Sequence, residues 1–197
     1  RSSPESWPRS TETRPTVRAA HWHNLNQLRT CQTQQDMTQL ILDSLSVFAP
    51  LVRVHSGGDF FSQGYFDAWL EVARQRQSTL FYAYTKSLPF WIARRSTIPA
   101  NFVLTASYGG TADALIASNG LRFAQVVFSA REAQALDLPI DHDDNHAMQL
   151  GGNFALLLHG QQPAGSAAQQ AQQELKADGW TGYSRHKRIA LPLCDAA

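Results

Sequence analysis

The chain has 197 residues, of which 43% are hydrophobic and 17% are charged, and its 17 Lys and Arg residues nearly balance 16 Asp and Glu residues. This composition is typical of one globular domain, excludes an acidic disordered protein, and provides no overall positive charge for nucleic acid. No run reaches the ~18 apolar residues of a membrane span, so no membrane partner is expected. Cys31 and Cys194 are too few for a four-cysteine zinc site or for an iron–sulfur cluster held by the cysteines of this chain alone.

The N-terminal stretch is rich in Pro, Ser, Thr and Arg and has no apolar periodicity. We predict a flexible Pro/Ser/Arg-rich arm over residues 1–20 and a single α/β domain over residues 21–197. The arm lacks the apolar core of a signal peptide, and the two cysteines lie far apart in the sequence. Both features favour a cytoplasmic location.

The first regular elements follow residue 30. Thr33 with Asp36 three positions later is typical of a helix start, and apolar residues recur at helical spacing until Pro50 ends the helix. The β-branched run at residues 51–55 predicts a strand. The apolar face at residues 66–73 then predicts a second helix.

The rest of the chain repeats this alternation. Strands are predicted at residues 80–85, 101–107, 121–129 and 154–159. Helices are predicted around residues 90–95, at residues 111–118 before an Asn-Gly stop, and from the Ser166 cap to Gly179. The acidic segment before Gly151 is predicted to be a loop.

Strands that alternate with helices indicate βαβ units. We therefore predict an α/β fold with a mostly parallel sheet of about five or six strands and flanking helices, joined by right-handed crossovers. The strands are nearly continuous apolar runs, as buried parallel strands are. Five or six strands are too few to close an eight-stranded barrel, so an open layer and an incomplete (β/α) barrel both remain open.

Parallel α/β folds bind ligands beyond the carboxyl ends of their strands, so the residues that follow each strand are the candidate site. The candidate catalytic residues are His55, Asp59, Lys86 and His159. The candidate ligand-binding residues are Gly57, Gly58, Ser107, Gly109, Gly110 and Thr111. If the strands are parallel, all these residues converge on one rim of the sheet.

This rim offers several kinds of chemistry. His55 could act as a general base or a metal ligand, Asp59 could orient it, and Lys86 could hold an anion. The turn at residues 109–111 leads into a helix N-terminus, where free N–H groups favour a phosphate or carboxylate. Structural roles are open for the same residues, because paired glycines often serve turns with positive φ and Thr111 could be a simple N-cap.

Residues 141–146 read Asp-His-Asp-Asp-Asn-His. In an extended loop His142, Asp144 and His146 would face the same way, and these side-chain types suit zinc, manganese or iron. A divalent metal is therefore one hypothesis, and a solvated loop with Asx turns is the other. The spacing matches neither HExxH nor a calcium-binding loop.

Two further features suit macromolecular partners. Phe60 and Phe61 follow Asp59 in a loop, where they could line a pocket or stack on a ring. Residues 184–188 are the densest basic stretch, which gives weak support for nucleic acid and fits a solvated segment equally well.

Residues 55–91 read HSGGDFFSQGYFDAWLEVARQRQSTLFYAYTKSLPFW, and this block resembles the phage and plasmid gene product 88 family. The later stretches IDHDDNHAM, GGNFALLLHGQQPAGS and GYSR are similar to the C-terminal part of the same family. The resemblance covers roughly residues 24–188. It implies a phage or mobile-element protein of unestablished activity, located in the host cytoplasm.

The resemblance also implies a partial radical S-adenosylmethionine-like barrel. In such enzymes a glycine-rich turn after the second strand contacts S-adenosylmethionine, and the turn at residues 56–59 stands at a similar place. Family members resemble these enzymes through an upstream cysteine-rich segment, but this chain has no cysteine triad, so no cluster chemistry is assigned to it.

Two functions follow as expectations. The first is an enzyme, or an enzyme-derived domain, that binds a small anionic or nucleotide-like ligand at the rim. The alternative is a non-enzymatic phage protein that binds a host protein or nucleic acid. The cofactor is unknown on either view.

Overall fold

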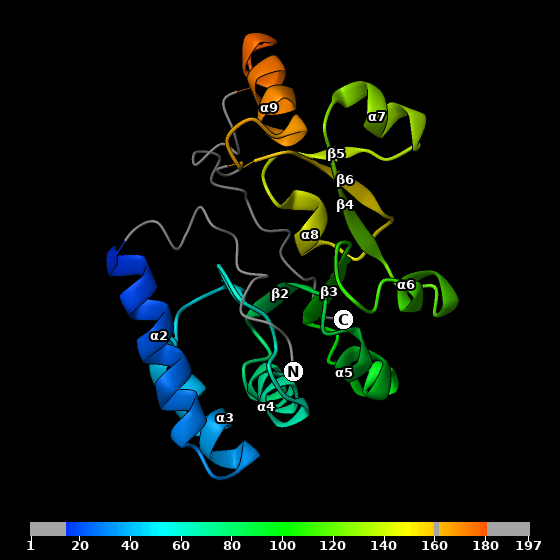
Figure 1. The fold of residues 1–197 in the computed structure, drawn as a ribbon. Coiled ribbons are helices and arrows are strands. Elements are labelled where there is room, and N and C mark those ends of the chain that lie inside the picture. Colours follow the sequence, from blue (N-terminus) through cyan, green and yellow to red (C-terminus); the bar gives the residue numbers. More distant parts are fainter. Residues whose placement is uncertain (1–14, 160–161, 181–197) are drawn as a thin grey trace.

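The computed structural model describes residues 15–159 and 162–180. Six strands form one sheet in the order β1-β2-β3-β4-β6-β5, and every neighbouring pair is parallel (Figure 1). The strands are β1 (Leu51–Arg53), β2 (Leu80–Thr85), β3 (Phe102–Ser107), β4 (Phe123–Val127), β5 (Ile140–Asp141) and β6 (Phe154–Leu157). The predicted α/β fold is confirmed, and the sheet curls into a half-barrel with flanking helices.

The helices begin where short polar side chains can cap them. Thr33 and Asp36 form a reciprocal capping box, and Ser62 and Ser166 each accept a backbone N–H from the first turn that follows. The helices are α2 (Pro15–Thr30), α3 (Gln34–Ser44), α4 (Gln63–Gln75), α5 (Leu88–Ala93), the 3₁₀ turn η2 (Arg95–Thr97), α6 (Ala114–Ser118), α7 (Ala130–Ala135), α8 (Asn145–Met148) and α9 (Ala167–Ala177). No helix among them is long and apolar enough to cross a membrane.

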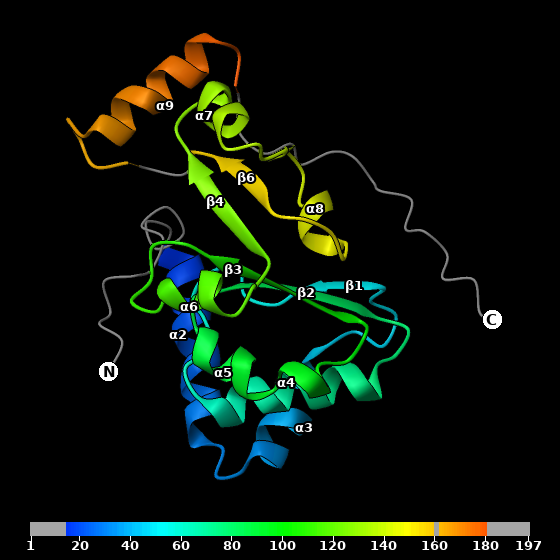
Figure 2. The same cartoon turned by 90° about the vertical axis from the view of Figure 1, so that its right-hand side faces the viewer.

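The register divides the sheet into two staggered halves. Strands β1, β2 and β3 pair almost in step, whereas only the last two residues of β3, Ala106 and Ser107, pair with the first two of β4. Strands β4 and β6 then continue about 10 Å beyond the end of β3, at about 3.3 Å per residue. Figure 2 shows the result, with β4 and β6 running away from the layer of β1, β2 and β3.

The two faces of the sheet are covered differently. Helices α3, α4, α5 and α6 pack on the outer face of the first half, where Phe66, Phe81 and Leu88 are almost completely buried. Helices α7 and α9 border the second half. The opposite, inner face carries Tyr82 and Tyr84 and is covered by α8, which packs on β2 and β3 (Figure 2).

Several elements differ from their predictions. The segment predicted as an acidic loop forms β5 and the one-turn helix α8, because Asp141 is buried in the sheet and its carboxylate holds backbone N–H groups of the next turn. Helix α2 was not predicted; none of its residues is buried, and Leu28 is only partly buried where it packs against the outer core. Helix α3 ends at Ser44, earlier than the position of Pro50 suggests.

Candidate functional site

At the carboxyl end of the first half of the sheet, the Asp59 carboxylate joins two loops. One of its oxygens accepts the Thr85 hydroxyl at 2.7 Å and the Phe60 N–H at 2.8 Å, and the other accepts the Lys86 N–H at 2.7 Å. The Ser87 hydroxyl also donates to the Phe60 carbonyl. Asp59 therefore fixes the turn after β1 against the end of β2.

Lys86 extends this link to β3. Its ammonium donates to the carbonyl and the hydroxyl oxygen of Ser107, both at 3.1 Å, and to the carbonyl of Tyr108. All three acceptors are neutral, and among the described residues no carboxylate forms an ion pair with Lys86. Burial lowers the pKa of Lys86, and the more distant charges of Asp113 and Asp59 oppose that shift.

His55 lies in the same group of loops. Its Nε2 is 3.1 Å from the Tyr65 hydroxyl, and its ring contacts Phe60 edge to face at 4.7 Å. Burial lowers the pKa of His55 to about 4, although the nearby Asp59 charge raises it, so the imidazole is neutral at pH 7. Its Nδ1 is buried with no hydrogen-bond partner in the described part of the chain.

The backbone of His55 is strained as well. Its φ of 68° lies in the left-handed region, which a non-glycine residue seldom adopts and which costs on the order of 1–3 kcal/mol. The following turn contains Gly57 and also Gly58, whose φ of 85° suits a glycine. Strain and a polar atom without a partner both occur more often at functional sites than elsewhere.

The glycine turn after β3 already holds an anion. The N–H groups of Gly109 and Gly110 donate to the two oxygens of the Asp113 carboxylate at 2.8 and 2.9 Å. The sequence predicted that these N–H groups bind an anionic ligand, and in the structure the Asp113 carboxylate occupies the position of that ligand. Thr111 is exposed, and the N-cap of α6 is Asp113, not Thr111.

The structure therefore brings His55, Asp59, Lys86 and the turn from Ser107 to Gly110 together. It does not bring His159 to them. His159 lies five residues beyond Phe154, which pairs with Ala124 at the level of Ser107, and this places it about 16 Å further along the strand direction. The staggered register explains the separation.

A second polar cluster lies on the inner face, around Asp144. Its carboxylate accepts the hydroxyls of Tyr82 and Tyr84, both at 3.0 Å, and forms an ion pair with Arg53 at 2.8 Å. Burial, and then the Asp144 charge, raise the pKa of both phenols. Asp144 has a left-handed φ of 64°, so this carboxylate is held by strained backbone.

The residues predicted to bind a metal point to different partners. The His142 ring packs on Trp180, Asp144 binds the inner-face tyrosines, and His146 lies 3.6 Å from the buried Asp141 carboxylate. Among the described residues, no three His, Cys, Asp or Glu side chains are grouped so that they could hold a metal ion. The metal site stays a prediction from the sequence.

Sequence reasoning named Asp144 but missed its partners in the inner-face cluster. Arg53, Tyr82 and Tyr84 lie within strands β1 and β2, not after their ends, where the candidate residues were sought. A signal was present, since Tyr82 and Tyr84 alternate with Ala83, and residues two apart in a strand share a face.

The structure describes the loop that contains Phe60 and Phe61 but not the basic stretch at residues 184–188. Phe60 is buried in the outer core, whereas Phe61 is 39% exposed and stacks on Tyr65 with ring centroids 4.6 Å apart. Residues 184–188 and Cys194 lie outside the described residues.

Fold and site together define a class: a parallel α/β half-barrel with one polar cluster at the carboxyl ends of its first strands and another on its inner face. The family model described as Gene product 88 matches residues 9–177. The chain therefore belongs to the gene product 88 family, as its sequence blocks suggested. This is a phage-type family of unknown activity. No curated protein and no solved structure matches the chain.

Proposed function

We propose that this chain is an enzyme-derived domain that binds a small anionic or nucleotide-like ligand at the carboxyl ends of β1, β2 and β3. The observation that carries the proposal is the environment of the Lys86 ammonium group. A half-buried ammonium with only neutral oxygens in contact is poorly compensated, and a bound anion would supply the missing charge. Parallel α/β folds commonly use this edge for ligands.

The neighbouring groups give the proposed site its chemistry. His55 is neutral at pH 7 and its Nδ1 is buried without a described partner, so a ligand has to displace the residues that cover Nδ1 before it can exchange a proton there. The Asp113 carboxylate accepts hydrogen bonds from the N–H groups of the glycine turn, as the carboxylate or phosphate of a ligand would. A bound anion therefore either displaces the Asp113 carboxylate or binds on the side of the turn that faces Lys86.

A titration with inorganic phosphate, followed by calorimetry, tests the proposal. Wild-type protein should bind phosphate, and Lys86→Met should lose at least tenfold in affinity. Lys176→Met is the matched control, because Lys176 is an exposed lysine at the end of α9 and its loss changes the net charge equally. Urea denaturation of both variants checks that they are folded. Equal phosphate affinity in the two variants would overturn the proposal.

One observation favours the alternative function, in which the chain binds a host protein without catalysis. Val47 and Phe48, in the turn between α3 and β1, are 60% and 89% exposed, and adjacent exposed apolar side chains of this size often mark a protein contact. If Phe48→Ser abolishes binding to a host protein identified as its partner while Lys86→Met leaves that binding intact, this alternative replaces the ligand-binding function.

A further inference from the structure

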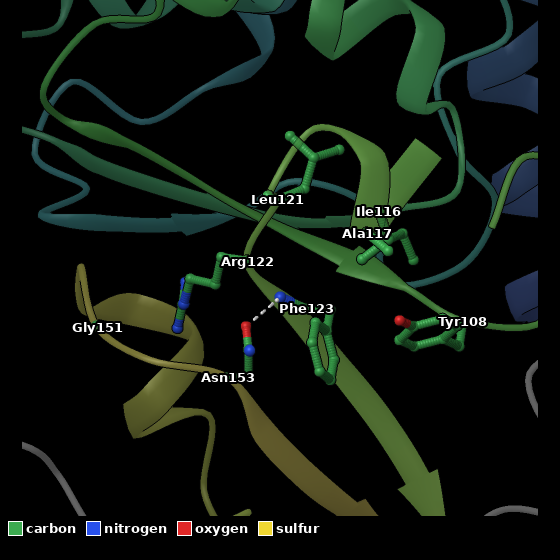
Figure 3. A pocket seen from close by; sticks show the side chains of 9 residues that line it. Tyr108, Ile116, Ala117, Leu121, Arg122, Phe123, Gly151 and Asn153 are labelled. Carbon is green, nitrogen blue, oxygen red and sulfur yellow. Dashed lines mark hydrogen bonds between the residues drawn. The ribbon is translucent and has the colours of Figure 1, made fainter. Parts of the chain in front are cut away.

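The staggered register creates a groove where the two halves of the sheet meet. The groove has a volume of about 390 Å³ and lies between the end of β3, helix α6 and the starts of β4 and β6 (Figure 3). Its lining includes Tyr108, Ile116, Arg122, Phe123, Gly151 and Asn153. Pockets for small molecules begin at roughly 300 Å³ and combine apolar walls with a few polar groups, as this groove does.

Two rings form one wall of the groove. Tyr108 and Phe123 contact each other edge to face, with centroids 5.0 Å apart and planes at 78°. Figure 3 shows both rings on one side and the side chains of Arg122 and Asn153 on the other. Aromatic walls of this kind favour a flat ring as the occupant.

The opposite wall favours a negative charge. Arg122 donates to the hydroxyl of Thr105 and to the carbonyls of His146 and Gly152, all of them neutral acceptors. Among the described residues no carboxylate forms an ion pair with it. The Oδ1 of Asn153 accepts the Phe123 N–H, and no hydrogen bond to a described residue engages its amide N–H₂, which leaves two donors for a ligand.

We propose that this groove binds a flat aromatic ring that carries an anionic group, the chemistry of a nucleoside monophosphate. The ring lies against Tyr108 and Phe123, and the anionic group lies toward Arg122. The groove adjoins the site of the proposed function, because the backbone of Tyr108 also contacts Lys86, but the anion-binding side chain of the groove is Arg122 and not Lys86. The inference therefore goes beyond the proposed function and names a ligand that has a ring.

Two adjacent glycines allow a matched steric test. A Cβ added at Gly151 or at Gly152 would meet no atom within 4 Å, and neither residue has a positive φ, so both positions accept a Cβ without strain and urea denaturation checks that the leucine variants are folded. Only Gly151 lines the groove. In calorimetric titrations with adenosine monophosphate, Gly151→Leu should therefore lose at least tenfold in affinity, whereas Gly152→Leu should bind as wild type does.

Parallel titrations separate this inference from the proposed function. Adenosine monophosphate should bind at least tenfold more tightly than inorganic phosphate, because the ring adds contacts in the groove, and adenosine should bind more weakly than its monophosphate. If phosphate binding needs Lys86 but Gly151→Leu leaves monophosphate binding unchanged, the groove inference fails and the proposed function stands. If Gly151→Leu abolishes monophosphate binding and Lys86→Met has no effect, the groove stands and the Lys86 site fails.

Discussion

The Asp59 carboxylate accepts the backbone N–H of Lys86 at 2.7 Å, across 27 positions of sequence. This bond joins the turn after β1 to the end of β2, and the Lys86 ammonium then joins β2 to the turn after β3. Three consecutive loops of the half-barrel are thus held by two side chains. The same two residues are candidates for ligand binding, so their structural and functional roles have to be separated by experiment.

Replacing Asp59 should destabilise the protein strongly. Asp59→Ala removes the acceptor of three hydrogen bonds and leaves the Lys86 N–H and the Thr85 hydroxyl without their partner, so we expect a loss of about 3 kcal/mol in the free energy of unfolding. Urea denaturation measures this loss. Asp43→Ala serves as a control on the exposed face of α3 and should change stability by less than about 0.5 kcal/mol. Equal stabilities of the two variants would contradict the structural role of Asp59.

Stability should fall in mild acid because of His55. Its pKa is lowered to about 4, so between pH 6.5 and 4 the unfolded chain binds a proton that the folded chain does not. Unfolding is therefore favoured as the pH falls through this window, with a total loss of about 3 kcal/mol below it.

His55→Asn should remove most of this His55 contribution, because asparagine does not titrate and tolerates a left-handed φ. Chemical denaturation at pH 7, 6 and 5 measures the slope for wild type and variant. The exposed His23 provides the control substitution, His23→Asn, which should leave the slope as in wild type. A wild-type slope that persists in His55→Asn would assign the effect to other groups.

The inner-face tyrosines should resist ionisation. Burial and the Asp144 charge raise the pKa of Tyr82 and Tyr84, so absorbance at 295 nm should show their ionisation only at a pH well above the ordinary value of about 10. Above that ordinary value the unfolded chain loses phenolic protons that the folded chain keeps, so stability falls as the pH rises.

A double-mutant cycle tests the contact itself. Tyr84→Phe should cost about 1 kcal/mol and Asp144→Ala should cost more, and their effects should not add, because both changes remove the same hydrogen bond. Strict additivity would mean that Asp144 and Tyr84 do not interact.

The turn after β3 should require glycine at position 109. Gly109 has a φ of 92°, which strains any residue with a Cβ, so Gly109→Ala should destabilise the protein by about 1–2 kcal/mol. Gly152→Ala is the matched control in open space and should have little effect. Thermal unfolding compares the two variants, and a melting temperature of Gly109→Ala equal to that of wild type would show that the turn relaxes.

Much of the fold was predictable because it depends on local pattern. The apolar runs at residues 80–85 and 101–107, separated by a helical segment, predict buried parallel strands, and β2 and β3 lie there. The caps at Thr33 and Ser62 are equally local, since each satisfies N–H groups within the next three residues. Likewise His55, Asp59 and Lys86 follow strands that are parallel and in step, so their proximity followed from the topology.

What the sequence by itself determined is therefore where five of the six strands of the described sheet lie, and that the first strand ends meet. Only the tertiary structure decided the two-residue overlap of β3 with β4, which moves His159 away from Lys86 and opens the groove at Phe123. It also decided that Asp144 reaches Tyr82 and Tyr84 across about 60 positions. The physical reason is that periodicity specifies the face of an element, whereas register and long-range partners depend on how whole faces pack together.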